Sequence, residues 1–348
     1  MKKDFPLSQL TTIGLGGNAR CYVSCSTRNE ILEALEFAEK NSLKVQVISG
    51  GSNIVFRDEG FEGLVLKINI KGIESSEDEK YVFLNSGAGE NWDEFVKFAV
   101  YKSLTGIECL SGIPGSVGAT PVQNVGAYGQ EVKESIVSVR AIDKNTFENI
   151  TFANSDCSFG YRDSRFKSAD RNKYIITEVK FRFEKNKLPE RSYEQLHRNI
   201  NLNNSENQSK SLFRKLSMIR DTVLELRKSK SMVIDKKDPN SRSCGSFFTN
   251  PIISKDDLEK LKGKFSHGIE IPVFMVGNLY KISAAWLVEQ AGFRKGHVKG
   301  GVGISKNHSL ALININGTSA ELLSLSEEIE KKVMKEFSIK LIKEPVIV

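Results

Sequence analysis

The sequence predicts an α+β protein of two or three domains. Its 348 residues, of which 39% are hydrophobic, can bury a sizeable core and divide into more than one domain. Segments with apolar residues at helical spacing alternate with short apolar runs that are typical of strands. Near the middle of the chain, residues 112–130 contain five glycines and two prolines but no charged side chain. We expect the rest of the chain to be organised around this loop.

Composition excludes several classes of protein. No apolar run reaches the length of a membrane span, and the basic N-terminus is not followed by an apolar stretch, so we expect a cytoplasmic protein without membrane insertion. The five cysteines form no Cys-x-x-Cys pair and lie far in sequence from the four histidines. We therefore expect no metal site, and cysteines that are buried rather than disulfide-bonded. The cysteines are Cys21, Cys25, Cys109, Cys157 and Cys244.

Positive charge is concentrated in one segment. The net charge is +7, and residues 209–243 hold ten Lys or Arg against four Asp or Glu. Phe213 is the only aromatic residue among them, and no nucleic-acid-binding motif accompanies the charge, so we expect no nucleic-acid partner. Two interpretations stay open: a solvated helix face, or a funnel that attracts an anionic nucleotide.

The first third of the chain shows a helix between strands. Residues 27–30 have the pattern of a capping box, and a helix should follow with Ile31, Ala34, Leu35 and Ala38 on one face. A strand at 44–48, a glycine turn at 49–53 and a strand at 54–56 come next. A Rossmann site would place a helix after such a turn, and Gly87-Ala88-Gly89 lacks a third glycine because Trp92 stands there. A dinucleotide is therefore held, if at all, by another fold.

Further elements follow the same patterns. We expect a strand at 81–84, a strand at 136–142, a strand at 174–183 and a strand at 310–315. A helix should present Trp92, Phe95, Val96 and Ala99 on one face, and a helix at 284–292 should be closed by its glycine. A last long helix should bury a stripe of Leu322, Leu325, Ile329 and Val333.

The loop at 112–130 suits a pyrophosphate. Glycine allows close approach of the backbone and proline fixes φ, so backbone N–H groups can face an anion. The Gln123 and Asn124 amides can both donate and accept hydrogen bonds. The alternative is a glycine-rich turn between elements.

This loop resembles the central flavin-binding segment of the UDP-N-acetylenolpyruvoylglucosamine reductase family, and three further motifs occur in the family's order. They are Tyr161-Arg162-Asp163-Ser164, the segment from Gly245 to Pro251, and Glu344-Pro345. The resemblance covers essentially the whole chain. It implies a vanillyl-alcohol-oxidase-type (PCMH-like) FAD-binding fold of two subdomains plus a C-terminal α+β substrate-binding domain. The implied division is 1–70, then 71–213 with the tail 339–348, then 214–338.

The resemblance implies an enzyme of peptidoglycan precursor synthesis. Members reduce UDP-N-acetylglucosamine enolpyruvate to UDP-N-acetylmuramate, with non-covalent FAD as cofactor and NADPH as co-substrate. The resemblance assigns catalysis to Arg162, which would hold the substrate carboxylate, to Ser246 as proton donor, and to Glu344 beside the same carboxylate.

Binding residues are carried over in the same way. The cofactor-binding residues are Gly50, Gly51, Ser52, Asn53, Gly112, Pro114, Gly115, Ser116, Gly118, Gln123, Asn124, Gly126, Ala127 and Tyr128. The substrate-binding residues are Tyr161, Tyr193, Lys230, Asn250 and Gln290, with Tyr193 placing the chain in the family's longer subtype. Ser49 stands where the first flavin loop of the family has a glycine, and this puts one backbone position in doubt.

Two other functions stay open at this point. The chain could be a flavin oxidase of the same fold acting on another substrate, or a nucleotide-binding module without redox activity. We expect a monomer that binds a small-molecule UDP-sugar.

Overall fold

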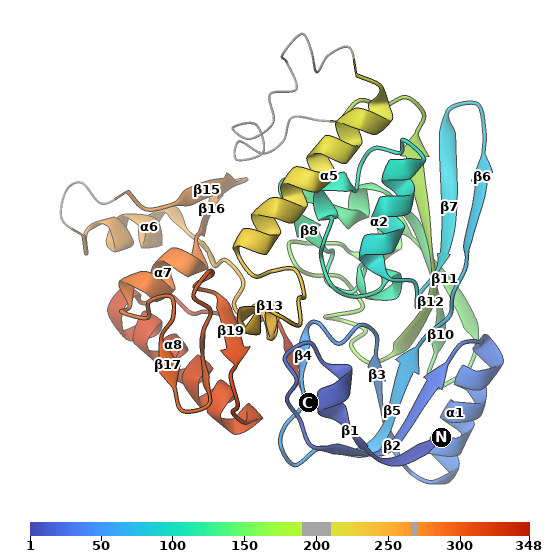
Figure 1. The fold of residues 1–348 in the computed structure, drawn as a ribbon, viewed down its shortest axis with the longest axis horizontal. Helices are drawn as coiled ribbons and strands as arrows, with labels where there is room; N and C mark the ends of the chain where they lie inside the picture. The colour runs from blue at the N-terminus through green and yellow to red at the C-terminus, as the bar shows by residue number, and fades with distance from the viewer. Residues whose placement is uncertain (190–209, 266–269) are drawn as a thin grey trace. The chain divides into compact units, whose positions relative to one another are not determined.

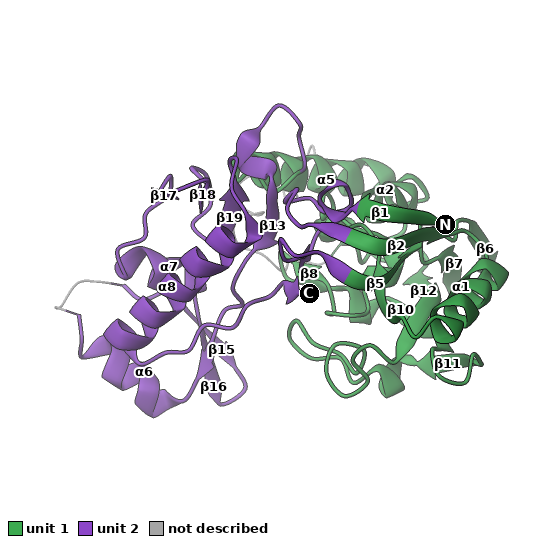
Figure 2. Ribbon diagram, turned by 90° about the horizontal axis from the view of Figure 1, so that it is seen from below, with its two compact units in different colours: residues 1–5, 19–51, 62–233 green, residues 6–18, 52–61, 234–348 purple. Residues whose placement is uncertain are grey.

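The computed structural model describes residues 1–189, 210–265 and 270–348 (Figure 1). The chain forms two compact units, each assembled from segments that are far apart in sequence (Figure 2). Unit 1 comprises Met1–Phe5, Ala19–Gly51 and Glu62–Val233, and unit 2 comprises Pro6–Asn18, Ser52–Phe61 and Ile234–Val348. The three-part division drawn from the sequence stays a prediction.

Unit 1, where the structure describes it, is built on two sheets and a small hairpin. The first sheet has the order β1-β2-β5-β3, and its strands are Lys2–Pro6, Asn18–Cys25, Phe61–Ile68 and Lys44–Ile48. The second has the order β11-β10-β12-β7-β6, and its strands are Asn149–Ala153, Ile136–Asp143, Tyr174–Glu184, Tyr81–Gly87 and Ile73–Glu77. The hairpin pairs β8, Gly126–Ala127, with β9, Gln130–Glu131. β3 and β5 are parallel, whereas every pair of the second sheet is antiparallel.

Among the described residues, the α-helices of unit 1 are α1, Arg28–Lys40, α2, Trp92–Tyr101, and α5, Leu212–Ser229. The hydroxyl of Thr27 accepts a hydrogen bond from the Glu30 N–H and caps α1. The Glu30 carboxylate accepts from the Ser26 N–H at 2.6 Å, one residue before the partner that the capping box predicts. All eight apolar residues that were predicted to face the core from α1 and α2 are buried.

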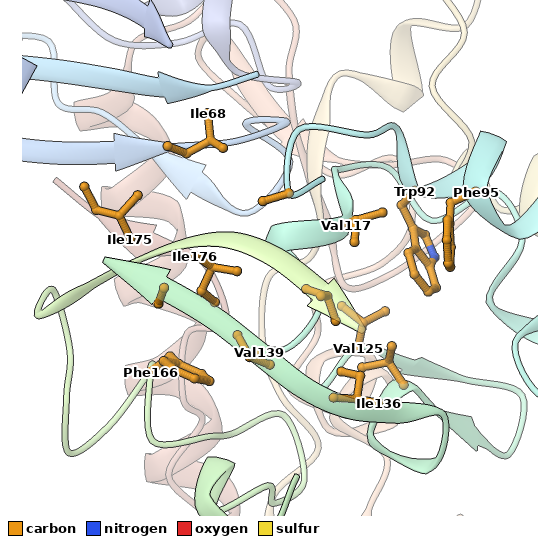
Figure 3. Packing of buried hydrophobic residues seen from close by; sticks show 14 of the residues in the cluster. Ile68, Trp92, Phe95, Val117, Val125, Ile136, Val139, Phe166, Ile175 and Ile176 are labelled. Carbon is orange, nitrogen blue, oxygen red and sulfur yellow. The ribbon is translucent and has the colours of Figure 1, made fainter. Parts of the chain in front are cut away.

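The glycine loop is anchored in the core of unit 1. Trp92 and Phe95 from α2 pack with Phe181 from β12, whose ring lies 4.7 Å from that of Phe95. Val117 and Val125 from the loop are buried in the same cluster (Figure 3). The loop is therefore held by apolar burial as well as by its backbone.

The described part of unit 2 contains two small sheets, a strand pair and three α-helices. The first sheet has the order β13-β19-β18-β17, and its strands are Ser243–Ser246, Ala311–Asn314, Val302–Ile304 and Val298–Lys299. The second has the order β14-β16-β15, and its strands are Ile252–Ile253, Leu279–Ile282 and Val273–Val276. The parallel pair joins β20, Val346–Ile347, to β4, Ile54–Val55. The helices are α6, Lys255–Lys262, α7, Ala284–Gln290, and α8, Ser319–Phe337.

Several sequence predictions are confirmed here. The predicted stripe of α8 is buried, and Gly292 closes α7 with a φ of 94°. All five cysteines are buried and free, as expected. Within the described ranges, no helix is long and apolar enough to cross a membrane. Many strands of unit 2 escaped sequence prediction because they are two to four residues long, too short to show a period of two.

Phe181→Ala should test the core of unit 1. The ring is fully buried among aromatic neighbours, so its removal should lower the free energy of unfolding by about 3–5 kcal/mol. Phe274→Ala is the matched control, because that ring is 56% exposed and its loss should change stability by less than about 0.5 kcal/mol. Urea denaturation of the two variants measures both changes in the free energy of unfolding. Equal losses in the two variants would contradict the placement of Phe181 in the core.

Candidate active site

The two glycine loops meet in unit 1. A Cβ built on Gly50 would lie 2.5 Å from the Cα of Gly115, so a side chain at residue 50 cannot be accommodated without movement of the backbone. Next to this contact, the Ser49 and Ser116 hydroxyls are hydrogen-bonded to each other. Ser49, the departure from the family's first loop, thus contacts a residue of the central loop.

The central loop is also hydrogen-bonded to the turn between β7 and α2. The Trp92 N–H donates to Gly115 at 3.2 Å, the Val117 N–H to Glu90 at 2.9 Å, and the Gly118 N–H to Ala88 at 2.9 Å. These bonds position the loop, so the N–H groups of Val117 and Gly118 are engaged within the protein. A Cβ on Gly118 would approach that of Ala88 to 2.5 Å, which explains the glycine by packing.

A buried cation lies beside the start of the loop. Arg227 in α5 is 9% exposed, and its Nη2 donates to the Met232 carbonyl at 2.9 Å. Its Nε has no hydrogen-bond partner among the described residues and lies 3.4 Å from where a Cβ of Gly112 would be. Burial lowers the pKa of this guanidinium, although Tyr128 and Asp93 oppose the shift. An uncharged loop with closely approaching backbones and an adjacent buried cation fits an anionic dinucleotide.

Asp93 connects this region to α5. Arg220 donates to both carboxylate oxygens of Asp93, at 2.6 and 2.7 Å, and the Gly112 N–H donates to one of them at 2.6 Å. Burial raises the pKa of Asp93, but the hydrogen bonds from Arg220 and Gly112 outweigh it and hold the pKa below its usual value. One carboxylate therefore joins α2, α5 and the first glycine of the loop.

Asn124 connects the loop to the segment that carries Arg162. Its amide nitrogen donates to the Glu131 carboxylate at 3.0 Å and to the Gly160 carbonyl at 2.9 Å. Its amide oxygen accepts from the Lys133 N–H at 3.2 Å. The side chain is fully buried, so its hydrogen-bonding capacity is directed to neighbouring parts of the protein.

The side chain of Arg162 contacts the glycine loop. The turn around it is closed by mutual backbone bonds between Gly160 and Asp163, of 3.0 and 3.3 Å, and Arg162 adopts the left-handed region at a φ of 54°. A non-glycine residue held there is strained, a feature found at functional sites. Its Nη2 donates to the Gly126 carbonyl at 2.6 Å, and its guanidinium lies 5.4 Å from the Tyr161 ring centroid. Tyr161 and Arg162 are thus brought to the predicted cofactor loop.

In unit 2 the backbone of Glu344 is bonded to that of Phe247, the residue that follows Ser246. Ser246 ends β13, and the carbonyl of the next residue, Phe247, accepts from the Glu344 N–H at 2.9 Å. Asn53 completes this arrangement, since its amide donates to the Glu344 carbonyl at 3.3 Å and its own carbonyl accepts from the Val346 N–H at 3.0 Å. The Ser246 Oγ also lies 3.2 Å from Nε2 of His308.

The structure does not bring the predicted substrate-binding residues into one described cluster. The Asn250 amide oxygen accepts from the Ala284 N–H at 2.9 Å and so holds the start of α7, whereas Gln290 is exposed at the other end of that helix. A seven-residue helix separates its ends by roughly 10 Å. Lys230 caps the C-terminus of α5 in unit 1. Tyr193 lies outside the described residues.

Sequence reasoning did not select Asp93, Arg220, Arg227 or His308. Arg227 lies in a segment recognised for its positive charge, but nothing local distinguishes it from its exposed neighbour Lys228. The other three acquire their partners from distant segments, and single-sequence patterns carry no signal for such contacts.

Asp93→Asn should destabilise the protein in a pH-dependent way. A carboxylate with a depressed pKa stabilises the fold above its unfolded pKa of about 3.9 and loses this contribution as the pH falls through its folded pKa. At neutral pH the substitution should lower the free energy of unfolding by about 2–3 kcal/mol, and the difference from the unsubstituted protein should shrink below about pH 4.

The control is Glu94→Gln, one residue along the same helix, because the Glu94 ion pair with Lys97 is exposed on both sides. Urea denaturation across the pH range measures both variants. A deficit for Asp93→Asn that stays constant with pH would show that the carboxylate charge is not responsible.

Comparisons with known proteins identify the family. Residues 19–146 match the model of an FAD-binding domain, and residues 238–348 match that of the UDP-N-acetylenolpyruvoylglucosamine reductase C-terminal domain. The UDP-N-acetylenolpyruvoylglucosamine reductase of Thermobifida fusca is 40% identical over 99% of this chain and 97% of its own length. That of Flavobacterium johnsoniae is 36% identical over 98% of this chain and 97% of its own.

A solved structure supports the same fold. The reductase of Thermus caldophilus aligns with a TM-score of 0.63 at 21% identity, over 98% of this chain and 96% of that one. The predicted class, an FAD-binding fold with a C-terminal α+β domain, is confirmed. By its identity to these relatives over nearly its whole length, the chain belongs to the UDP-N-acetylenolpyruvoylglucosamine reductase family.

Proposed function

We propose that this chain is an FAD-containing reductase that uses NADPH to convert UDP-N-acetylglucosamine enolpyruvate to UDP-N-acetylmuramate, a step in making peptidoglycan precursors. The observation that carries the proposal is the backbone bond from Glu344 to Phe247. It joins two motifs from opposite ends of the C-terminal domain, and it supports the proposal because Phe247 directly follows the serine that we expect to supply the proton.

The glycine loops at residues 50–53 and 112–128 would hold the flavin, which would supply hydride transfer from NADPH to the terminal carbon of the enolpyruvyl group. Arg162 is the residue that binds the substrate carboxylate, through the paired donors of its guanidinium. Its carbonyl accepts from Lys167 at 2.8 Å and its guanidinium donates to Gly126, so both ends of the residue are positioned in advance. Negative charge that develops on the carboxylate and on its neighbouring carbon is stabilised without further reorganisation.

Ser246 delivers the proton to the carbon that bears the carboxylate. Serine is a weak acid in water, so this role needs an enclosed site and a group that stabilises the alkoxide left behind. Glu344 assists at the substrate carboxylate. Its backbone is fixed from two sides, by Phe247 and by Asn53.

The flavin is bound without a covalent link. None of the loop residues assigned to cofactor binding is a histidine or cysteine. All five cysteines are buried, and burial raises the pKa of the thiol to about 11 for Cys25 and to about 12 for Cys157 and Cys244. Such thiols are poor nucleophiles at neutral pH.

The basic segment that contains α5 serves the nucleotide diphosphate, with Lys230 at its end as a contact. Asn250, Gln290, Tyr161 and Tyr193 are the further substrate contacts that we propose. On the sequence argument alone, we place the reaction in the cytoplasm and expect a monomer that does not bind nucleic acid.

Ser246→Ala should separate the two half-reactions. Flavin reduction by NADPH should proceed at a near-normal rate, while oxidation of the flavin by the enolpyruvyl nucleotide should slow by at least about a hundredfold, because positioned proton transfer contributes about 10²- to 10⁴-fold. Stopped-flow absorbance measures each half-reaction. Ser246→Cys, which returns an ionisable proton at this position, should recover part of the lost rate. Equal slowing of both half-reactions, or of neither, would exclude Ser246 as the acid.

Lys230→Ala should weaken substrate binding without loss of flavin. A cation that contacts a diphosphate acts through electrostatics that salt screens, so KM for the nucleotide should rise and the difference should narrow at high ionic strength. Lys40→Ala is the control, because this lysine is exposed in the last turn of α1 and lies outside the basic segment. Steady-state kinetics and the flavin absorbance of the purified variants give the answer, and loss of flavin from Lys230→Ala would refute the assignment.

A further inference from the structure

His308 faces the proposed proton donor. Its Nε2 lies 3.2 Å from the Ser246 Oγ, and both side chains are only partly exposed. The two residues come from different segments, the end of β13 and the turn between β18 and β19. Either atom can be the donor in this contact, depending on the tautomer of the ring.

The turn that carries His308 is fixed at several points. The His308 carbonyl accepts from the Ala311 N–H at 3.1 Å, and the Lys306 N–H donates to the Asn240 side chain at 2.9 Å. The Ser309 hydroxyl donates to the Glu289 carboxylate of α7. On the other side, the Phe247 N–H donates to the Leu310 carbonyl at 2.8 Å. These bonds hold the turn that carries the imidazole, and the bond between Phe247 and Leu310 keeps that turn beside Ser246.

The chemistry of a serine acid calls for such a partner. When the Ser246 O–H bond breaks, negative charge collects on Oγ, and a serine O–H that pointed at the imidazole could not be delivered to substrate. An imidazole N–H that donates to Oγ stabilises the developing alkoxide. It also orients the serine O–H away from the ring, so that the proton can be delivered to substrate. Histidine can in addition give up that proton near neutral pH.

We propose that His308 is a positioning residue for Ser246: its imidazolium donates Nε2–H to Oγ and passes that proton to the serine as the serine gives up its own. The inference rests on the function proposed above, in which Ser246 is the acid. As a C–H bond forms on the substrate, the Ser246 O–H bond breaks. In the same step the Nε2–H bond of the imidazolium breaks as the serine O–H forms again, which leaves a neutral imidazole that regains its proton from solvent.

The first test compares His308→Gln with His297→Gln in the flavin-loaded protein. Glutamine keeps a neutral donor near the position of Nε2 but has no proton to relay. For His308→Gln, flavin reduction by NADPH should be unchanged and flavin oxidation by the enolpyruvyl nucleotide should slow by at least about tenfold. His297 packs against Phe293 and does not contact Ser246, so its substitution should change neither half-reaction.

The second test asks whether the two side chains act as one unit. In a double-mutant cycle, Ser246→Ala with His308→Ala should oxidise the flavin no more slowly than Ser246→Ala alone, because the histidine acts only through the serine. The rate of flavin oxidation can also be measured in mixtures of light and heavy water. Its dependence on the fraction of heavy water should show two protons in transfer for the unsubstituted protein and one for His308→Gln.

A third readout does not depend on activity. With 15N-labelled histidine, the NMR signal that disappears in His308→Gln should be that of a ring protonated at Nε2, and it should shift in Ser246→Ala. An unprotonated Nε2, additive rate losses in the double mutant, or normal flavin oxidation by His308→Gln would each overturn the proposal. If instead Ser246→Ala itself oxidises normally, the function assigned to Ser246 fails and the role of His308 falls with it.

Discussion

The close approach of Gly50 to Gly115 is the constraint on which the arrangement of unit 1 depends. No side chain fits between these two backbones, so glycine is required at the contact for a steric reason that is independent of any ligand. From this contact the central loop runs past the β7–α2 turn, to which it is hydrogen-bonded at Trp92, Val117 and Gly118. The loop keeps a defined path even though it contains only short segments of regular structure.

Because the loop has no charge of its own, its charged partners are supplied from outside. Asp93 from α2 binds the Gly112 N–H, Arg220 from α5 neutralises Asp93, and the guanidinium of Arg162 binds the Gly126 carbonyl. Ion pairs in partly buried positions stabilise little unless their hydrogen bonds are satisfied, and the bidentate Asp93–Arg220 pair meets that condition. Arg227 differs, since its Nε remains unsatisfied among the described residues and a buried, unsatisfied donor is costly. A bound anion would remove that cost.

Unit 2 obtains its reactive geometry from strand pairing rather than from rigid loops. β20, at the end of the chain, pairs with β4 near its beginning, and this parallel contact fixes the residues on either side of it. Glu344 is thereby held next to Phe247, and the β18–β19 turn holds His308 against Ser246. Backbone hydrogen bonds thus position the segments that carry the proposed proton donor, its proposed partner and the carboxylate residue, and such preorganisation limits the movement needed during a reaction.

The sequence by itself determined the long helices and the longer strands and, through motifs that resemble a known family, the chemistry. α1, α2 and α8 were predictable because long amphipathic helices repeat their apolar residues every three to four positions. The glycine loop was visible because an uncharged segment rich in glycine and proline is rare in a soluble protein. Ser246, Arg162 and Glu344 were selected by short motifs, and the assignment of roles to them stays a proposal.

Only the tertiary structure decided which of these residues lie together. The Asp93–Arg220 pair, the Asn124 contacts with Gly160 and Lys133, and the His308–Ser246 contact all join distant segments or opposite sides of a turn. The amide of Asn124 illustrates the limit, because the sequence shows that it can donate and accept but not which groups it meets. The two-unit division likewise depends on contacts between segments that are far apart in the sequence. Periodicity reports the environment of a residue within its own element, whereas a pairing depends on how elements pack, and that information appears only when the chain is folded.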